Sequence, residues 1–173
     1  MKPIEVRRIR ADEWDMLRSI RLCALEESPL SFITTLGEAR AHPQQLWVDR
    51  AHAGAVGPDQ ITMVAVRGSD AVGLAIGLRR RKPPLDVVPV VSVFVRDAVR
   101  RQGVAGSLMN GVETWAREGG ATTTSLWVVE GNGDARAFYE QRGYIETLDR
   151  KKIRVPPERW ERRFEKPLEV PAS

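Results

Sequence analysis

The feature that most constrains the fold is an apolar, β-branched run at residues 87–95, followed by a short basic loop with two glycines at residues 100–106. The run is about half as long as a membrane helix and has the length of a strand. Because it is continuously apolar rather than alternating, it predicts a strand that is buried on both of its faces. Such strands belong to sheets covered by helices, so this segment favours an α/β fold.

The rest of the chain alternates between strand and helix patterns. Hydrophobic periodicity and turn residues predict seven strands, at residues 4–9, 61–66, 71–78, 87–95, 125–129, 144–148 and 160–168. They predict four helices, at residues 12–25, 43–53, 107–118 and 134–141, with Asp12 as the N-cap of the first. Residues 30–42 are interpreted as a loop or an irregular helix. No repeat or clear linker interrupts the 173 residues, so we expect one domain spanning residues 1–173.

The net charge of +4 comes from a local excess of basic residues. Between residues 79 and 101 the chain has seven Lys and Arg and only two Asp. A local excess favours a binding site for an anion over a generally basic surface. The basic cluster at residues 79–82 has no aromatic neighbour of the kind that nucleic-acid surfaces use, so we expect no nucleic-acid partner.

Composition and cysteine content are typical of a globular protein from a reducing compartment. Hydrophobic residues make up 42% and charged residues 29%, which excludes a disordered or collagen-like chain. The first sixteen residues contain charges but no apolar block, which predicts neither a secretory signal nor a membrane partner. A lone Cys23 cannot form an internal disulfide, so we expect a cytoplasmic protein. Two histidines without ligands at metal spacing predict no metal site.

The loop at residues 100–106 has the properties of a phosphate site. It precedes a predicted helix, whose first N–H groups are free and lie at the positive end of the helix dipole. Gly103 and Gly106 let a ligand approach the backbone, and Arg100 and Arg101 add forked donors suited to phosphate. The Gly-Lys-Ser/Thr of phosphate-loop proteins and the three spaced glycines of dinucleotide sites are absent. The expected ligand is therefore a phosphate or a pyrophosphate.

Two ordered motifs make the chain similar to a known family. Residues 100–105, Arg-Arg-Gln-Gly-Val-Ala, match the Arg/Gln-x-x-Gly-x-Gly/Ala signature of the GNAT-superfamily N-acetyltransferases. Residues 136–144, Arg-Ala-Phe-Tyr-Glu-Gln-Arg-Gly-Tyr, resemble the family's Phe-Tyr-x-x-x-Gly-Tyr/Phe helix, and residues 21–29 resemble its first helix and turn. The order of elements agrees over nearly the whole chain. The resemblance implies a GNAT-type α/β fold, with a mixed central β-sheet splayed between the fourth and fifth strands and about four flanking helices.

Acetyl-CoA is the co-substrate that the resemblance implies. The pantetheine arm is expected to lie between the strands at residues 87–95 and 125–129, and the pyrophosphate on the backbone amides of residues 101–106. Asn132 matches the family position that binds the pantetheine arm, and Arg136 is a further candidate for a phosphate contact. The implied cofactor-binding residues are Val93, Phe94, Val95, Arg100, Arg101, Gln102, Gly103, Val104, Ala105, Gly106 and Asn132.

The implied reaction is transfer of an acetyl group to a primary amine by direct attack in a ternary complex. Tyr139 matches the family's usual general acid, which protonates the leaving thiolate. An ammonium group must lose a proton before it attacks, and the candidate bases are Glu26, Glu27, Asp86 or an ordered water. Cys23 lies in the apolar stripe of its helix and is expected to pack in the core, which disfavours an acetyl-cysteine intermediate.

The sequence leaves the acceptor amine undetermined. In this fold the acceptor pocket is built from the loop after the first helix and from the last two strands, and both segments are mixed in charge. Glu26 and Glu27 are the expected substrate contacts, because they would attract a cationic amine. A small-molecule or peptide amine is the expected partner, and exposed edge strands with Trp160 are compatible with a homodimer. The alternative function is a non-catalytic module of the same fold that senses or scaffolds acyl-CoA.

Overall fold

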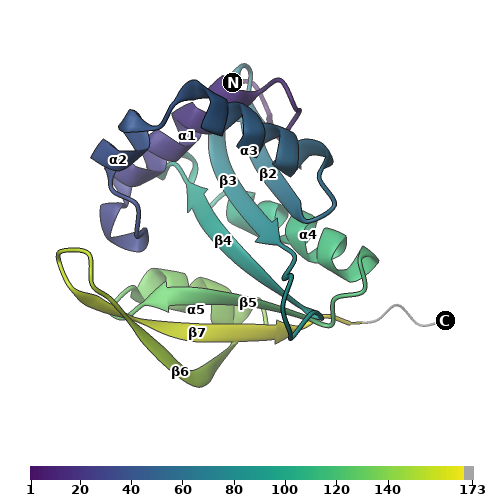
Figure 1. Ribbon diagram of the computed structural model, residues 1–173, viewed down its shortest axis with the longest axis vertical. Helices are drawn as coiled ribbons and strands as arrows, with labels where there is room; N and C mark the ends of the chain where they lie inside the picture. Colours follow the sequence, from purple (N-terminus) through teal and green to yellow (C-terminus); the bar gives the residue numbers. More distant parts are fainter. Residues whose placement is uncertain (170–173) are drawn as a thin grey trace.

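The computed structural model describes residues 1–169, in which seven strands form one mixed sheet (Figure 1). The strand order is β1-β2-β3-β4-β5-β7-β6. Every neighbouring pair is antiparallel except β4 and β5, which are parallel. The strands are β1 (Ile4–Arg8), β2 (Gln60–Arg67), β3 (Asp70–Leu78), β4 (Val87–Val95), β5 (Thr123–Val129), β6 (Ile145–Ile153) and β7 (Arg159–Pro167).

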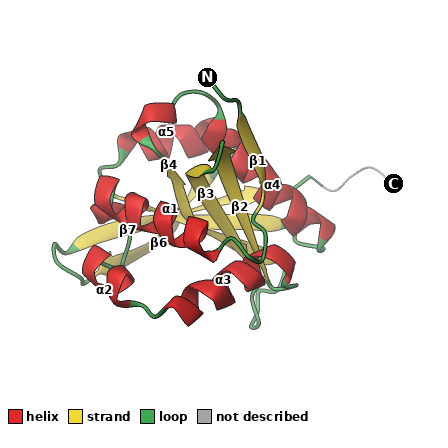
Figure 2. Cartoon of the chain, turned by 90° about the horizontal axis from the view of Figure 1, so that it is seen from above, coloured by secondary structure: helices red, strands yellow, loops and turns green. Residues whose placement is uncertain are grey.

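Helices cover both faces of the sheet. Within residues 1–169 the helices are α1 (Trp14–Glu27), α2 (Leu36–Ala41), α3 (Gln44–Val56), α4 (Val104–Glu118) and α5 (Gly133–Gln141). α1 and α3 pack on one face of β2 and β3, and α4 packs on the other face (Figures 1 and 2). α5 covers the half of the sheet that β5, β7 and β6 form. The mixed α/β fold with its sheet of seven strands confirms the prediction.

Double burial explains why β2 is apolar along almost its whole length. Ile61, Met63 and Ala65 belong to the core that contains α4, while Val64 and Val66 belong to the core that contains α1 and α3. All five side chains are buried. Since successive residues of a strand point to opposite faces, a strand covered on both faces needs apolar residues at every position.

A fifth helix, α2, lies within residues 30–42, which the sequence analysis interprets as a loop or an irregular helix. Thr35 is its N-cap: the Thr35 hydroxyl accepts a hydrogen bond from the Glu38 N–H, and the Glu38 carboxylate accepts one from the Thr35 N–H. This reciprocal pair is a capping box. The Thr-x-x-Glu spacing was therefore a readable start signal for a helix.

The prediction of Asp12 as the N-cap of the first helix is wrong. α1 begins at Trp14 and its N-cap is Glu13, whose carboxylate accepts a hydrogen bond from the Arg10 N–H at 2.9 Å. The same carboxylate forms an ion pair with Arg7 of β1 at 2.6 Å. A contact to the neighbouring strand, rather than a local side-chain cap, therefore determines where the helix begins.

β4 and β5 separate soon after they meet, which confirms the predicted splay. Only residues 87–89 of β4 pair with β5, opposite residues 123–125. The last paired residue is Pro89, which has no N–H to donate to a ladder. Farther along β4 the register with β3 shifts, and Ser92 has a positive φ of 57°. A bulge of this kind bends a strand, so β4 turns away from β5.

The prediction that β4 is buried on both faces is wrong for its central residues. Val91 retains 39% of its surface exposed, and Ser92 and Val93 are half-buried. The two ends of the strand are buried, as expected. The exposed apolar residues lie where β5 has diverged and no longer covers the edge of β4. The apolar run therefore lines an open cleft at its centre.

Candidate functional site

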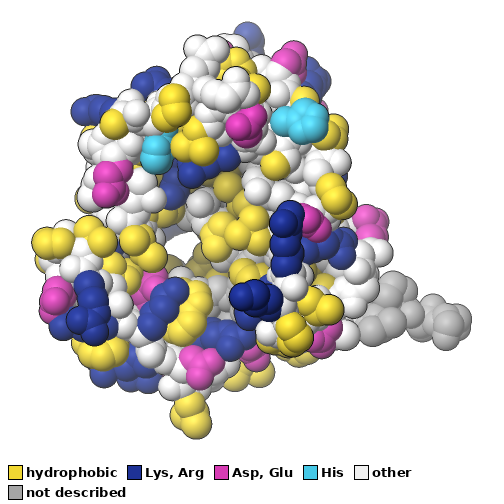
Figure 3. Space-filling model, in the orientation of Figure 1, with side chains coloured by type: hydrophobic (Ala, Val, Ile, Leu, Met, Phe, Trp, Pro, Cys, Tyr) yellow, Lys and Arg dark blue, Asp and Glu magenta, His cyan; other side chains and the backbone are white. Residues whose placement is uncertain are grey.

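A cleft of about 400 Å³ lies between the diverging strands. Its walls come from β4, β5, α1, α5, the segment between α1 and α2, and the β6–β7 hairpin. Figure 3 shows the hollow between the half of the molecule that contains α1 to α3 and the half that contains β5 to β7. The volume is in the range of sites that bind small molecules. We take this cleft as the candidate active site.

The loop before α4 has the backbone of an anion-binding turn. Arg101 and Gly103 both have positive φ, at 60° and 78°. Gly103 is the N-cap of α4, and no side chain caps the helix. The first N–H groups of α4 therefore have no intrahelical or capping partner and are available to an anion. Arg101 and Gln102 are exposed beside them.

Arg100 belongs to the same loop, but its guanidinium already bonds to other residues of the protein. Its Nε donates to the Val95 carbonyl at 3.0 Å, and its Nη1 pairs with Asp97 at 2.5 Å. These contacts hold the loop against the end of β4. Gly106, in the first turn of α4, lies close to Arg142, because a Cβ there would be 3.3 Å from the Arg142 Nη1.

The predicted pantetheine contacts on β4 lie beside the cleft. Val93 lines it, while the side chains of Phe94 and Val95 are buried in the two cores on either side of the sheet. The edge of these residues that would face β5 has no strand partner, since the pairing stops at Pro89. An extended ligand with amide groups can pair with such an edge.

Asn132 lies at the mouth of the cleft, where β5 gives way to α5. It is the N-cap of α5, and its side-chain oxygen accepts a hydrogen bond from the Ala135 N–H at 3.2 Å. The cap orients the first turn of α5 toward β5. The asparagine therefore has a structural role in addition to the ligand contact that the resemblance implies.

Tyr139 lines the cleft from α5 and is otherwise buried. Its ring packs edge-to-face with Tyr144, with 5.5 Å between the ring centroids. Burial raises the pKa of the Tyr139 hydroxyl well above its ordinary value, so the hydroxyl keeps its proton. No hydrogen bond among residues 1–169 involves this hydroxyl, unlike that of Tyr144, which bonds to Thr124 and Glu113.

Three charged residues that line the cleft were not singled out as site residues from the sequence. Arg21 reaches it from α1, Lys151 from β6 and Glu161 from β7. Glu161 is 6% exposed, and its Oε2 has no hydrogen-bond partner. In the sequence it is one acid in a strand of mixed charge, and no local signal distinguishes it. Its place in the cleft depends on β7 lying next to β5, opposite Val129.

The acids predicted from the sequence lie elsewhere. Glu26 pairs with Arg40 at 2.8 Å and lines a different hollow beside α1. Glu27 accepts a hydrogen bond from the Asp97 N–H at 3.0 Å, behind the end of β4. Asp86 accepts a hydrogen bond from Thr122 at 2.7 Å, at the closed end of the β4–β5 pair. The structure does not bring these three carboxylates into the cleft.

Cys23 is half-buried, and it packs against the core that contains α1 and α3 rather than inside it. Its thiol donates to the Glu27 carboxylate at 3.2 Å. Burial and the nearby carboxylate raise the pKa of the Cys23 thiol to about 11. A thiol that keeps its proton is a poor nucleophile, which is consistent with the expectation of no acetyl-cysteine intermediate.

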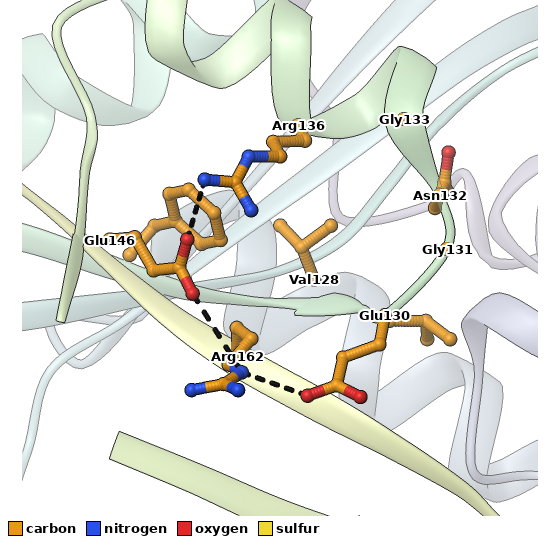
Figure 4. Close-up of a pocket in the computed structure, with 10 residues that line it drawn as sticks. Val128, Glu130, Gly131, Asn132, Gly133, Arg136, Glu146 and Arg162 are labelled. Carbon is orange, nitrogen blue, oxygen red and sulfur yellow. Dashed lines mark hydrogen bonds and ion pairs between the residues drawn. The ribbon is translucent and has the colours of Figure 1, made fainter. Parts of the chain in front are cut away.

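A second hollow lies on the α5 side of the β5–β7–β6 sheet, and its charges pair with one another (Figure 4). Arg136 forms an ion pair with Glu146 at 2.7 Å. Arg162 lies 2.8 Å from Glu130 and 3.7 Å from Glu146. The Arg136 guanidinium, which the sequence offered as a phosphate contact, is engaged in this network.

Neither metal ligands nor membrane helices are found among residues 1–169. No three His, Cys, Asp or Glu side chains gather where they could hold a metal ion. No helix has both the length and the apolar character that crossing a bilayer requires.

The chain matches a known family in sequence. Residues 14–144 match the model of the acetyltransferase (GNAT) family. This match covers both sequence motifs and most of the cleft. No curated protein matches the chain significantly.

Solved structures match the fold. An acetyltransferase of the GNAT family from Streptococcus pneumoniae has 14% identity and a TM-score of 0.80, with 96% of this chain and 100% of that chain covered. The yncA protein of Salmonella typhimurium, with its cofactor acetyl-CoA, has 12% identity and a TM-score of 0.79, with 99% of this chain and 97% of that chain covered. The paia N-acetyltransferase of Thermoplasma acidophilum, in complex with coenzyme A, has 13% identity and a TM-score of 0.71, with 95% of this chain and 99% of that chain covered.

Proposed function

The chain belongs to the GNAT acetyltransferase family, and from this premise we propose that it transfers an acetyl group from acetyl-CoA to a primary amine. The observation that carries the proposal is the cleft between β4 and β5, which opens where their pairing stops. Two proteins of similar fold were solved with acetyl-CoA or coenzyme A, which supports acetyl-CoA as the co-substrate.

The residues present fit such a co-substrate. The uncapped N–H groups of α4 suit a pyrophosphate, and Arg101 adds a positive charge beside them. The unpaired edge of β4 at residues 93–95 suits the amides of a pantetheine arm. Asn132 lines the same cleft. In this proposal these groups bind the co-substrate and leave its thioester near the middle of the cleft.

Tyr139 is the proposed general acid. Tyr139 lines the cleft, and its hydroxyl keeps its proton because it is buried and makes no hydrogen bond within residues 1–169. When the amine nitrogen bonds to the thioester carbonyl carbon, the C–S bond breaks and a thiolate leaves. The Tyr139 hydroxyl gives that sulfur its proton, and the surplus proton of the new amide nitrogen restores the phenol.

Glu161 replaces the acids predicted from the sequence as the proposed general base. Before it attacks, a protonated amine must give up a proton, and a carboxylate in the cleft can accept it. Glu161 is the carboxylate that lines the cleft, whereas Glu26, Glu27 and Asp86 do not. The amine and the thioester then react directly in a ternary complex.

The first test is isothermal titration of the protein with acetyl-CoA, comparing Gly103→Glu with Gly120→Glu. Both glycines have positive φ, and a Cβ at either would meet nothing within 4 Å. They lie at opposite ends of α4, so the two variants carry similar backbone strain. We expect tight binding by the wild type and by Gly120→Glu, and weak binding by Gly103→Glu. Equal affinity of both variants would contradict the proposed pyrophosphate site.

Turnover distinguishes an enzyme from a module that only binds acyl-CoA. Release of free thiol from acetyl-CoA is followed with a panel of primary amines, for the wild type and for Tyr139→Phe. We expect an amine-dependent rate that falls about 10²-fold in Tyr139→Phe, with unchanged acetyl-CoA affinity. Tight acetyl-CoA binding without amine-dependent release would favour the non-catalytic alternative.

A further inference from the structure

Arg21 is a largely buried cation without an anionic partner. It reaches the cleft from α1, its Nη1 has no hydrogen-bond partner, and no ion pair among residues 1–169 includes it. Its guanidinium lies 4.5 Å from the centre of the Phe32 ring. Burial and the nearby Arg50 lower the Arg21 pKa to about 10, so the side chain is still a cation at neutral pH. Because a buried cation is stabilised by a paired anion, Arg21 is suited to bind one.

Glu161 is a buried carboxylate on the opposite side of the cleft. It belongs to β7, while Arg21 belongs to α1, and these elements lie on opposite sides of the hollow (Figures 1 and 3). The Glu161 Oε2 lies 3.4 Å from the Lys151 Nζ, but without the geometry of a hydrogen bond. The Lys151 ammonium is drawn over the Trp127 ring, 4.3 Å from its centre. Glu161 therefore retains an oxygen that can accept from a ligand amine.

Apolar side chains line the same cleft as these two charges. Phe32, Ile33, Val91 and Trp127 all line the cleft. Ile33 and Val91 are 55% and 39% exposed, which is unusual for large apolar residues that lie in a hollow. A ligand with an apolar body, rather than a wholly polar one, would bury this surface.

A cross-link joins the segment after α1 to β7 near the cleft. Arg159 of β7 donates to the carbonyl oxygens of Leu30 and Phe32, both at 2.6 Å. These bonds hold the segment after α1 against the β6–β7 hairpin and keep Phe32 beneath Arg21.

We propose that the acceptor is a free amino acid with an apolar side chain, its carboxylate bound by Arg21 and its amine directed to Glu161. The inference rests on the proposed acetyl transfer and adds the substrate class. A simple amine would leave Arg21 unpaired, and a polyamine or an aminoglycoside would bring further positive charge toward it. A peptide N-terminus carries an amide where an amino acid carries its carboxylate. An apolar amino acid matches both charges and the apolar side chains that line the same cleft.

The test measures kcat/KM by thiol release for the common amino acids other than cysteine, whose own thiol would be detected. Each amino acid that is acetylated is compared with the amine of the same skeleton that lacks the carboxylate, such as phenethylamine for phenylalanine or isoamylamine for leucine. We expect at least one apolar amino acid to be acetylated, with a kcat/KM about 10²-fold above that of its carboxylate-free counterpart.

Variants of Arg21 assign this preference to the proposed contact. We expect Arg21→Met to reduce the ratio of the two kcat/KM values to near one, and Arg21→Lys to retain part of it. The matched control is Arg18→Met, because Arg18 lies on the same helix but lines a different hollow. It should leave the ratio unchanged. The thermal midpoint and the acetyl-CoA affinity of each variant show that it is folded.

Three results would overturn the inference. The first is that carboxylate-free amines are acetylated as well as amino acids by the wild type. The second is that Arg21→Met leaves the ratio of kcat/KM values unchanged. The third is that no amino acid is acetylated by a protein that binds acetyl-CoA, which leaves the proposed co-substrate in place. Absence of acetyl-CoA binding would instead overturn the proposed function, and this inference with it.

Discussion

Two adjacent residues of β7 face two different environments. Arg162 faces the α5 side of the β5–β7–β6 sheet, where Glu130 and Glu146 pair with it. Glu161 faces the cleft, where its Oε2 has no hydrogen bond, and Arg21 across the cleft has no anionic partner. On the α5 side Arg162 and Glu130 pair at 2.8 Å. On the cleft side Glu161 has only the longer 3.4 Å ion pair with Lys151, and no ion pair among residues 1–169 includes Arg21, so both remain able to bind a ligand under the proposal.

The α5 side also contains the most buried ionic cluster. Glu113 of α4 is 4% exposed. Its carboxylate lies 2.9 Å from the Lys166 Nζ and 3.4 Å from the Arg142 Nη2, and it accepts a hydrogen bond from the Tyr144 hydroxyl at 3.2 Å. The cluster joins α4, α5 and β7 behind the cleft. It therefore stabilises the wall on which Tyr139 is placed. Charge changes on the two sides should have opposite consequences, which four substitutions test.

The largest expected effect is on catalysis, in Glu161→Gln. Loss of the proposed base should lower kcat/KM by about 10²–10⁴-fold with little change in thermal midpoint. Thiol-release kinetics and a thermal melt measure the two quantities. Glu165→Gln is the matched control, since Glu165 lies on the same strand and pairs with Arg163. A Glu161→Gln enzyme within threefold of the wild type would show that this carboxylate is not the base.

The next effect is on stability, in Glu113→Gln. The substitution leaves Lys166 and Arg142 without their buried carboxylate, so the free energy of unfolding should fall by about 2–3 kcal/mol. Urea denaturation measures it. An unchanged free energy of unfolding would show that this buried cluster does not stabilise the protein.

Arg21→Met should raise the free energy of unfolding, whereas Glu113→Gln should lower it. The Arg21 pKa is lowered from 12.5 to about 10, so below pH 10 the folded protein bears the full cost of the buried cation. As pH rises from about 10 to 12.5 the unfolded chain binds more protons than the folded one, and this cost is relieved. At neutral pH, methionine should therefore raise the free energy of unfolding by on the order of 1 kcal/mol without ligand.

Denaturation at pH 7 and pH 8 measures this gain, which should be equal at the two values because both lie far below pH 10. A loss of stability in Arg21→Met would mean that the contact of the guanidinium with Phe32 outweighs the cost of burying it.

The smallest effect is expected for Glu146→Gln on the α5 side. Its partners Arg136 and Arg162 are both partly exposed and keep the carboxylates of Glu140 and Glu130. Such pairs contribute little, so the free energy of unfolding should fall by less than about 1 kcal/mol and kcat/KM should not change. A large loss of activity would show that the second hollow takes part in the reaction.

The sequence predicted the parts of the fold that local rules govern. The seven strands and four of the helices follow from periodicity and turn residues. The loop around Gly103 was found because the start of a helix after a basic turn has free N–H groups whatever the surrounding fold. The capping box of α2 was equally local and was overlooked. These features depend only on neighbouring residues in the chain.

The sequence failed where several elements meet. Burial of β4 was predicted from its apolar run, yet Val91 is exposed in the cleft because β5 diverges after Pro89. Glu26 and Glu27 were expected near the acceptor because they follow the first helix, but they are engaged by Arg40 and the Asp97 N–H. The direction in which a helix end or a strand edge faces is determined by the elements packed against it.

The sequence by itself determined the family, the seven strands and the loop that is suited to a pyrophosphate, because each depends on contiguous residues. Only the tertiary structure decided which charges meet. Arg21 and Glu161 face the same cleft because the sheet order places β7 beside β5, and Glu161 faces it rather than α5 because successive residues of a strand alternate between faces. Strand order is a property of long-range pairing, and the residues on either side of Glu161 do not encode it.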